Sequence, residues 1–150
     1  MRHLGFTGTR LGMTDPQRTT VRRYLSALHG QGFTWLHHGD CVGADEEAHA
    51  IWTGLAGMVH VHPGKLPGEP GRAMCQADVV GRVLGPLIRN VEIIETVSAL
   101  VAAPGTEGEV VRSGTWATVR AALRLGRWVV VCTPSGEHHV LGPSQLSLPL

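Results

Sequence analysis

The chain has 150 residues, of which 43% are hydrophobic and 17% are charged, and its formal net charge is +1. This length and composition are typical of one soluble globular domain, and the near-neutral charge argues against a strongly basic nucleic-acid-binding surface. No run approaches the about 18 consecutive apolar residues of a membrane span, and the run after Met1 is too short for a signal peptide.

The first predicted strand, residues 2–7, is followed by a helix over 15–29. That helix starts with Asp15, a preferred capping residue, and Pro16, a preferred first-turn residue, and its apolar residues recur at helical spacing. Apolar runs and helical patterns then alternate along the chain. They predict a strand at 33–38, a helix at 44–55, a strand at 57–62, a helix at 86–96, a strand at 98–103, a helix at 114–125 and a strand at 127–132.

The alternation of strands and helices favours an α/β fold. We expect a Rossmann-like, open and mainly parallel sheet of five strands or slightly more, with helices on both faces. The stretch 63–84 is rich in Gly and Pro and interrupts the alternation, so it predicts a long functional loop with room for one short helix. The expected domain spans 1–134, and a flexible tail follows over 135–150.

Cysteine and histidine spacing predicts no metal site. The three cysteines are far apart and form no CxxC motif, which argues against disulfides and structural zinc and fits a reducing cytoplasm. Histidines at 38, 49, 60 and 62 also lack a recognised ligand spacing, so we expect neither a metal nor a cofactor.

Three loops at the expected carboxyl edge of the sheet share an unusual composition. The sequences TGTR, HHGDCVGAD and APGTEGEVVRSGTW follow the predicted strands 2–7, 33–38 and 98–103 and are dense in Gly, Ser and Thr. Ligands of open parallel sheets bind at this edge, and such loops allow backbone N–H groups and hydroxyls to contact a phosphate. Each loop alone is compatible with an ordinary strand-to-helix turn, but three at one edge favour a nucleotide-sized ligand.

In this order, TGTR, HGDCVGAD, GPLIRN and SGTWATVRAA resemble motifs of the SLOG superfamily. This superfamily includes DNA-processing protein A (Smf), the lonely-guy phosphoribohydrolases and short bacterial and phage proteins of the YspA type. The similarity spans about residues 2–133. It implies a Rossmann-like fold that binds a nucleotide or a nucleotide-derived ligand, and it implies a homodimer.

The resemblance and the loop pattern together give the expected ligand-binding residues. They are Thr7, Gly8, Thr9, Arg10, Gly39, Asp40, Gly43, Ala44, Asp45, Arg89, Asn90, Ser113, Gly114, Thr115 and Trp116. Arg10 and Arg89 would supply charge-assisted bonds to an anion.

Three of these residues have an ordinary structural alternative. Asp45 is also a plausible helix cap, and Arg89 could form a surface ion pair. Trp116, near the start of a helix, is more typical of core packing than of stacking on a base.

One departure from the lonely-guy motif favours binding over hydrolysis. Those enzymes carry a PGGxGTxxE loop, and if Gly114 and Thr115 align with its GT, Thr118 takes the place of the catalytic Glu. Asp40 and Glu109 remain as reserve catalytic carboxylates for cleavage of an N-glycosidic bond. Single-stranded DNA binding is a weaker alternative, because the chain has few aromatic residues and little net charge.

The sequence QLSLPL, residues 145–150, carries an independent signal. It resembles the hexapeptide with which bacterial replication and repair proteins bind the DNA sliding clamp. Gln145 would anchor a polar subsite, while Leu146, Leu148 and Leu150 would fill an apolar pocket. The alternatives are that these leucines pack on the domain or form a frayed end.

Overall fold

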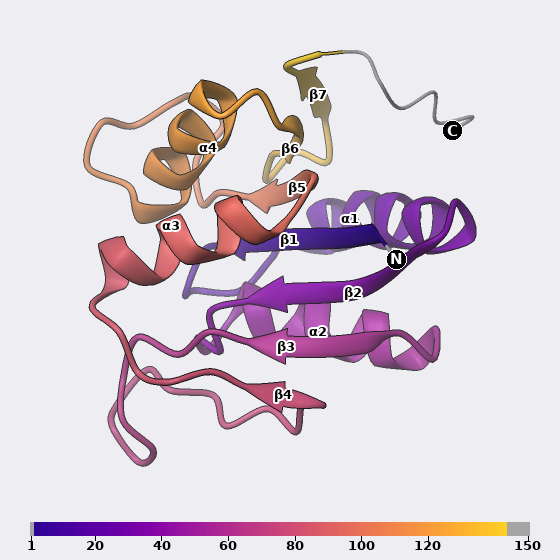
Figure 1. The fold of residues 1–150 in the computed structure, drawn as a ribbon. Coiled ribbons are helices and arrows are strands. Elements are labelled where there is room, and N and C mark those ends of the chain that lie inside the picture. Colours follow the sequence, from indigo (N-terminus) through magenta and orange to yellow (C-terminus); the bar gives the residue numbers. More distant parts are fainter. Residues whose placement is uncertain (1, 144–150) are drawn as a thin grey trace.

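A computed structural model describes residues 2–143 and shows one sheet between two layers of helices (Figure 1). The described strands follow the spatial order β4-β3-β2-β1-β5-β6-β7. Their bounds are β1 Arg2–Gly8, β2 Phe33–His38, β3 Met58–Val61, β4 Val79–Val80, β5 Ala99–Ala103, β6 Trp128–Cys132 and β7 His138–Leu141. The helices are α1 Asp15–Gly30, α2 Ala44–Gly54, α3 Pro86–Thr96 and α4 Gly114–Arg124.

The sheet is parallel except at one edge, where β7 runs antiparallel to β6. Helices α1 and α2 cover one face, and α3 and α4 lie on the other (Figure 1). The mainly parallel Rossmann-like architecture expected from the sequence is therefore confirmed. None of the helices within residues 2–143 is long and apolar enough to cross a membrane.

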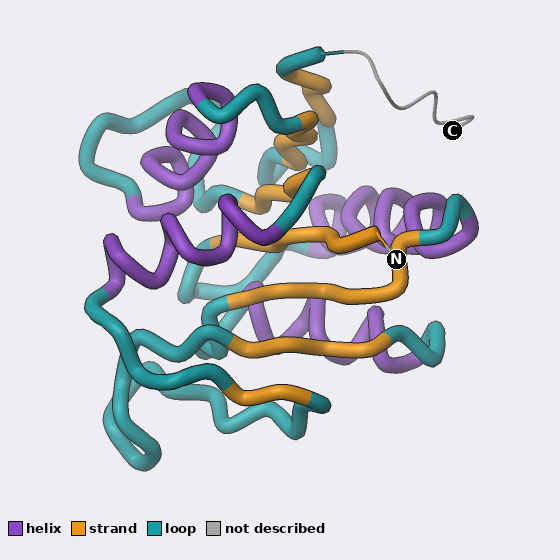
Figure 2. Tube along the Cα trace, in the orientation of Figure 1, coloured by secondary structure: helices purple, strands orange, loops and turns teal. Residues whose placement is uncertain are grey.

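Two strands lie where the sequence analysis expected none. Within the long loop between β3 and α3, the short strand β4 pairs with β3 (Figure 2), in place of a short helix. A strand of two residues is too short to produce a readable alternation.

Strand β7 lies in the segment expected to be part of the flexible tail. A tight turn at Gly136, whose φ is 90°, folds the chain back after β6. The Gly136 N–H donates to the Thr133 carbonyl at 2.9 Å, and the four residues of β7 then pair with β6. The expectation of a flexible tail from residue 135 is thus wrong for 138–141, because these residues form β7. This strand covers the edge that β6 would otherwise expose.

Helix α1 is fixed at its start by a cap and by a buried glutamine. The cap is Thr14, one residue earlier than expected, and its hydroxyl accepts from the Gln17 N–H at 3.1 Å. The Gln17 amide nitrogen donates to the carbonyls of Pro104 and Cys132, both at 2.8 Å. These bonds tie α1 to the carboxyl ends of β5 and β6 and so help to shape the edge where the loops converge.

Candidate functional site

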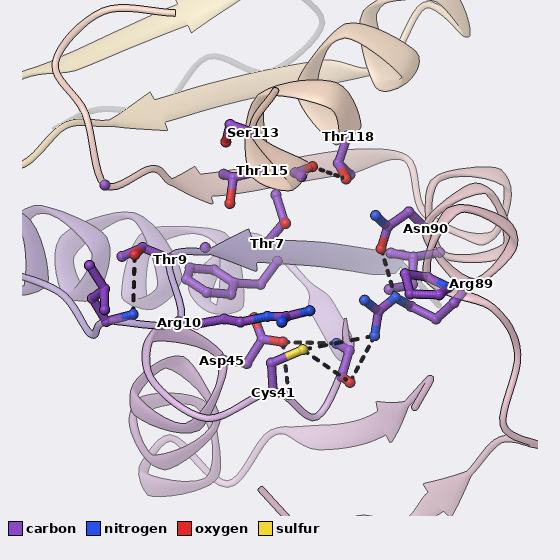
Figure 3. A pocket seen from close by; sticks show the side chains of 18 of the residues that line it. Thr7, Thr9, Arg10, Cys41, Asp45, Arg89, Asn90, Ser113, Thr115 and Thr118 are labelled. Carbon is purple, nitrogen blue, oxygen red and sulfur yellow. Dashed lines mark hydrogen bonds between the residues drawn. The ribbon is translucent and has the colours of Figure 1, made fainter. Parts of the chain in front are cut away.

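A cleft of about 500 Å³ opens at the carboxyl edge of the sheet, between the loops that follow β1, β2 and β5 and helix α3 (Figure 3). Most of the expected ligand-binding residues line it: Thr7, Gly8, Thr9, Arg10, Gly39, Asp45, Arg89, Asn90, Ser113, Gly114 and Thr115. The structure therefore brings together residues from four separate parts of the chain.

Four expected ligand-binding residues do not line this cleft, namely Asp40, Gly43, Ala44 and Trp116. Ala44 is fully buried, and its N–H donates to the Thr9 carbonyl at 2.9 Å, so it fixes the first loop from behind. Trp116, in the first turn of α4, packs in the core, and its indole N–H donates to the Thr106 hydroxyl at 3.0 Å. The core-packing alternative for Trp116 agrees with this position.

The two reserve carboxylates do not line the cleft. The Asp40 carboxylate is fully buried, where it pairs with Arg72 and accepts from the Cys75 N–H at 2.9 Å. Glu109 is exposed and pairs with Arg120 at 2.7 Å. Neither group is placed to act on a ligand in the cleft.

Asp45 lies at the floor of the cleft and connects the second loop to α2. Its Oδ2 accepts from the N–H groups of Gly39 and Cys41, both at 3.2 Å. Burial raises the pKa of Asp45 to about 6, although these N–H groups and the nearby Arg89 guanidinium favour the charged form. Among the described residues that line the cleft, Asp45 is the one carboxylate.

Arg89 is a buried cation that links α3 to two strand ends. Its Nη1 donates to the carbonyls of Gly39 at 3.0 Å and His62 at 3.2 Å, and its Nε donates to Asn90 Oδ1 at 2.7 Å. A Cβ on Gly39 would overlap Nη1, so a larger residue here would displace the Arg89 guanidinium. Arg89 places positive charge beneath the cleft while its hydrogen bonds go largely to the protein.

Unlike Arg89, Arg10 is exposed, and its side chain extends into the cleft toward Arg89 (Figure 3). Its guanidinium makes no hydrogen bond or ion pair with the residues that the structure describes. The hydroxyls of Thr7 and Thr115 and the Asn90 amide nitrogen likewise have no partner within residues 2–143. The cleft thus holds a cation and several polar groups that are available to a ligand.

The N-terminus of α4 faces the same space. The Ser113 hydroxyl caps the helix by accepting from the Trp116 N–H at 3.3 Å. The N–H groups of Gly114 and Thr115, in the first turn, have no carbonyl partner inside the helix. Such N–H groups and the helix dipole favour an anion.

The sequence analysis missed the apolar wall of the cleft. The additional lining residues are Phe6, Leu11, Cys41, Pro86, Leu87, Ile93, Gly105, Thr106 and Val110, together with Thr118, which the sequence analysis had placed at the lonely-guy Glu position. Several are exposed apolar residues of α3 and the loop before α4. These apolar residues lie next to the polar motifs in the sequence. That neighbourhood could have predicted that they line the same cleft.

No protein-family model matches the chain, and no curated protein matches it in sequence. Solved structures do match. The chain superposes on the molybdenum cofactor binding protein from Rippkaea orientalis with a TM-score of 0.67 at 18% identity, covering 88% of this chain and 76% of that one. The Moco carrier protein from Chlamydomonas reinhardtii gives a TM-score of 0.61 at 22% identity, with 87% and 75% covered.

DNA processing protein A from Streptococcus pneumoniae gives a TM-score of 0.65 at 16% identity, with 87% of this chain and 50% of that chain covered. This chain shares their Rossmann-like fold. DNA-processing protein A is one of the proteins that the sequence motifs resemble, so the fold implied by the SLOG resemblance is confirmed. At these identities the similarity shows the fold alone.

Proposed function

We propose that the chain binds a nucleotide or nucleotide-derived phosphate ester in the cleft. The observation that carries this proposal is the unpaired guanidinium of Arg10, which shares the cleft with the open N-terminus of α4 at Ser113 and Gly114. A cation and free N–H groups around one space are the arrangement that binds phosphate. The hydroxyls of Thr7 and Thr115 add further donors.

The size and walls of the cleft support the same ligand class. A volume of about 500 Å³ lies within the usual range of small-molecule sites, which is about 300–1,000 Å³. The exposed side chains of Leu11, Leu87 and Val110 supply an apolar surface for a base, and the loops after β1 and β5 supply the polar end. Two structural neighbours are by name a molybdenum cofactor binding protein and a Moco carrier protein, so molybdenum cofactor belongs in a ligand panel.

We favour binding over hydrolysis for a structural reason. Thr118, at the position of the lonely-guy carboxylate, donates its hydroxyl to the Gly114 carbonyl at 2.9 Å. Asp45 is the remaining candidate, but its Oδ2 is occupied by two backbone N–H groups. A ligand bound here would therefore be returned intact.

Native mass spectrometry of the purified protein, followed by incubation with a nucleotide panel, tests this proposal. We expect one intact small molecule per chain, and no release of free base or ribose phosphate. Turnover that Asp45→Ala abolishes would instead support the alternative, a phosphoribohydrolase. Tight binding of single-stranded DNA with no small-molecule ligand would support the remaining alternative, a single-stranded DNA-binding protein.

We also propose that the protein forms a homodimer. Helix α3 exposes Leu87, Ile88 and Val91, with exposed fractions of 75%, 65% and 44%. Such a row of apolar side chains is typical of a surface that contacts a protein partner. Light scattering should give the mass of a dimer, and Ile88→Asp should shift it to that of a monomer; a monomeric wild-type chain would contradict this.

The proposed sliding-clamp motif, Gln145 to Leu150, lies outside the described residues. We retain it as a proposal that the chain is tethered to a bacterial clamp through Gln145, Leu146, Leu148 and Leu150. Co-elution with a bacterial clamp should be lost when residues 145–150 are deleted. Unchanged co-elution, or none with the intact chain, would contradict it.

A further inference from the structure

Three histidines meet on the face of the sheet that carries α3, outside the lining of the proposed nucleotide cleft. His37 lies on β2, His60 lies on β3, and His62 directly follows β3. One ring nitrogen from each lies within 4.8 Å of the others, and His37 Nδ1 and His62 Nε2 are 2.8 Å apart. These residues come from two strands with no local ligand spacing, which is why the sequence analysis expected no metal.

The outer nitrogens of two of these rings already have orienting partners. His62 Nδ1 donates to Glu92 Oε1 at 2.7 Å, which leaves the lone pair of Nε2 directed at His37. His37 Nε2 lies 2.8 Å from His3 Nδ1. A metal-binding histidine typically uses its second ring nitrogen in this way, and a carboxylate partner fixes the tautomer and strengthens the ligand.

The protons of the cluster can be rearranged so that a metal ion replaces the hydrogen bond between His37 and His62 while the one between His37 and His3 is kept. Without a metal, His37 Nδ1–H donates to His62 Nε2, and His3 Nδ1–H donates to His37 Nε2. With a metal on His37 Nδ1, the His37 proton resides on Nε2 and donates to His3 Nδ1, while His3 carries its own proton on Nε2. Each ring keeps one proton, so three neutral imidazoles are available as ligands.

Burial favours the uncharged form of these three rings. Burial, followed by the effects of His62 and His60, lowers the pKa of His37 to about 3, and burial also lowers the pKa values of His60 and His62. Neutral imidazole is the form that binds metal ions.

An ion can reach the cluster through His60. This side chain is partly exposed, whereas His37 and His62 are buried. Helix α3 contacts this face through Glu92, and α4 lies over β5 and β6 (Figure 1). The His60 ring is stacked on His62 with centroids 4.1 Å apart, so His60 must turn its ring to share an ion.

A second cluster, His38, His49 and Cys75, is less suited to a metal. His38 Nδ1 accepts the Asp40 N–H at 3.0 Å, so the proton of the neutral ring is on Nε2. That nitrogen faces His49 Nδ1 at 3.0 Å and has no lone pair to offer an ion. Burial also raises the pKa of the Cys75 thiol to about 12, which disfavours the thiolate that binds metals.

We propose that His37, His60 and His62 form a binding site for a divalent transition-metal ion of the zinc type, with Glu92 and His3 orienting the rings. Three imidazole nitrogens suit Zn²⁺, Co²⁺, Ni²⁺ and Cu²⁺, whereas Mg²⁺ and Ca²⁺ require oxygen ligands. None of the three histidines lines the nucleotide cleft, and metal binding by the histidines does not require the proposed nucleotide function.

Titration of the full chain with Zn²⁺ by calorimetry, and with Co²⁺ by visible absorption, tests the proposal. We expect one ion per chain and Co²⁺ absorption bands typical of nitrogen ligands. The variant His60→Ala, at the least buried ligand, should weaken Zn²⁺ binding at least about 10-fold, and Glu92→Gln should weaken it about 10–100-fold. Circular dichroism and thermal unfolding show whether each variant keeps the fold.

Two matched variants separate this site from other histidines. His139→Ala, at an exposed position on β7, and His49→Ala, in the second cluster, should leave Zn²⁺ affinity unchanged. Absence of stoichiometric Zn²⁺ binding by the wild-type chain would overturn the proposal. Loss of binding in His49→Ala with full binding in folded His60→Ala would also overturn it and assign the ion to the second cluster.

Discussion

The substitution Gly43→Ala tests how the first two loops are held together. Gly43 precedes α2 with φ 92° and ψ −126°, a backbone conformation that alanine rarely adopts. A Cβ at this position would overlap the Arg10 carbonyl and lie 2.7 Å from the Thr9 carbonyl oxygen. The substitution therefore strains α2 at its start and pushes the Arg10 loop away from it.

The expected cost has two parts. Holding alanine in this backbone region costs about 1–3 kcal/mol. Relieving the overlap costs about 1–3 kcal/mol more, because both neighbours are backbone groups rather than flexible side chains. We therefore expect Gly43→Ala to lower the free energy of unfolding by about 4 kcal/mol, which is a large share of the about 5–15 kcal/mol typical of a domain.

Urea unfolding followed by tryptophan fluorescence measures this cost. The matched control is Gly54→Ala at the other end of α2, where an added Cβ would contact nothing within 4 Å. That control should be neutral or stabilising by up to about 1 kcal/mol, since alanine favours the helix. A Gly43→Ala protein within about 0.5 kcal/mol of wild type would refute the account of this junction.

Two further substitutions test buried charges near the cleft. Burial raises the pKa of Asp45 from 3.8 to about 6. Between these two pH values the folded state keeps a proton that the unfolded state loses. The free energy of unfolding therefore falls by on the order of 3 kcal/mol as the pH rises from about 4 to 6. The stability of Asp45→Asn relative to wild type, from urea unfolding, should rise over that pH window and then level off; a difference independent of pH would contradict this. Arg72→Ala leaves the buried Asp40 carboxylate without its partner and should cost about 3–5 kcal/mol, whereas exposed Arg82→Ala should stay within about 0.5 kcal/mol. Equal stabilities of the two arginine variants in the same assay would show that the ion pair contributes little.

Local patterns in the sequence predicted the fold well. The alternation of apolar runs with helical spacing located the long strands and all the described helices, and Pro16 marked the start of α1 within a residue. Glycine- and hydroxyl-rich loops at strand ends also indicated which edge of the sheet carries the cleft. These features depend on short-range chemistry that a single sequence displays.

Features that depend on tertiary contacts were not predictable in this way. Asp40 looked like a site carboxylate, but Arg72, far along the chain, pairs with it behind the cleft. Trp116 packs in an apolar cluster of the core, and its indole N–H donates to Thr106. His37 and His62 lie 25 positions apart, and only the register of β2 and β3 makes them neighbours.

The most direct test of the central claim is the affinity of Arg10→Ala for nucleoside monophosphates and diphosphates, measured by calorimetry beside Arg22→Ala. Arg22 is an exposed arginine of α1 and serves as the charge-matched control. If Arg10 binds the phosphate, its loss should weaken binding at least about 10-fold, since a hydrogen bond to a charged group contributes about 1.5–3 kcal/mol. Arg22→Ala should bind as wild type does. Equal affinities of Arg10→Ala and wild type would contradict the proposal that the cleft is an anion site.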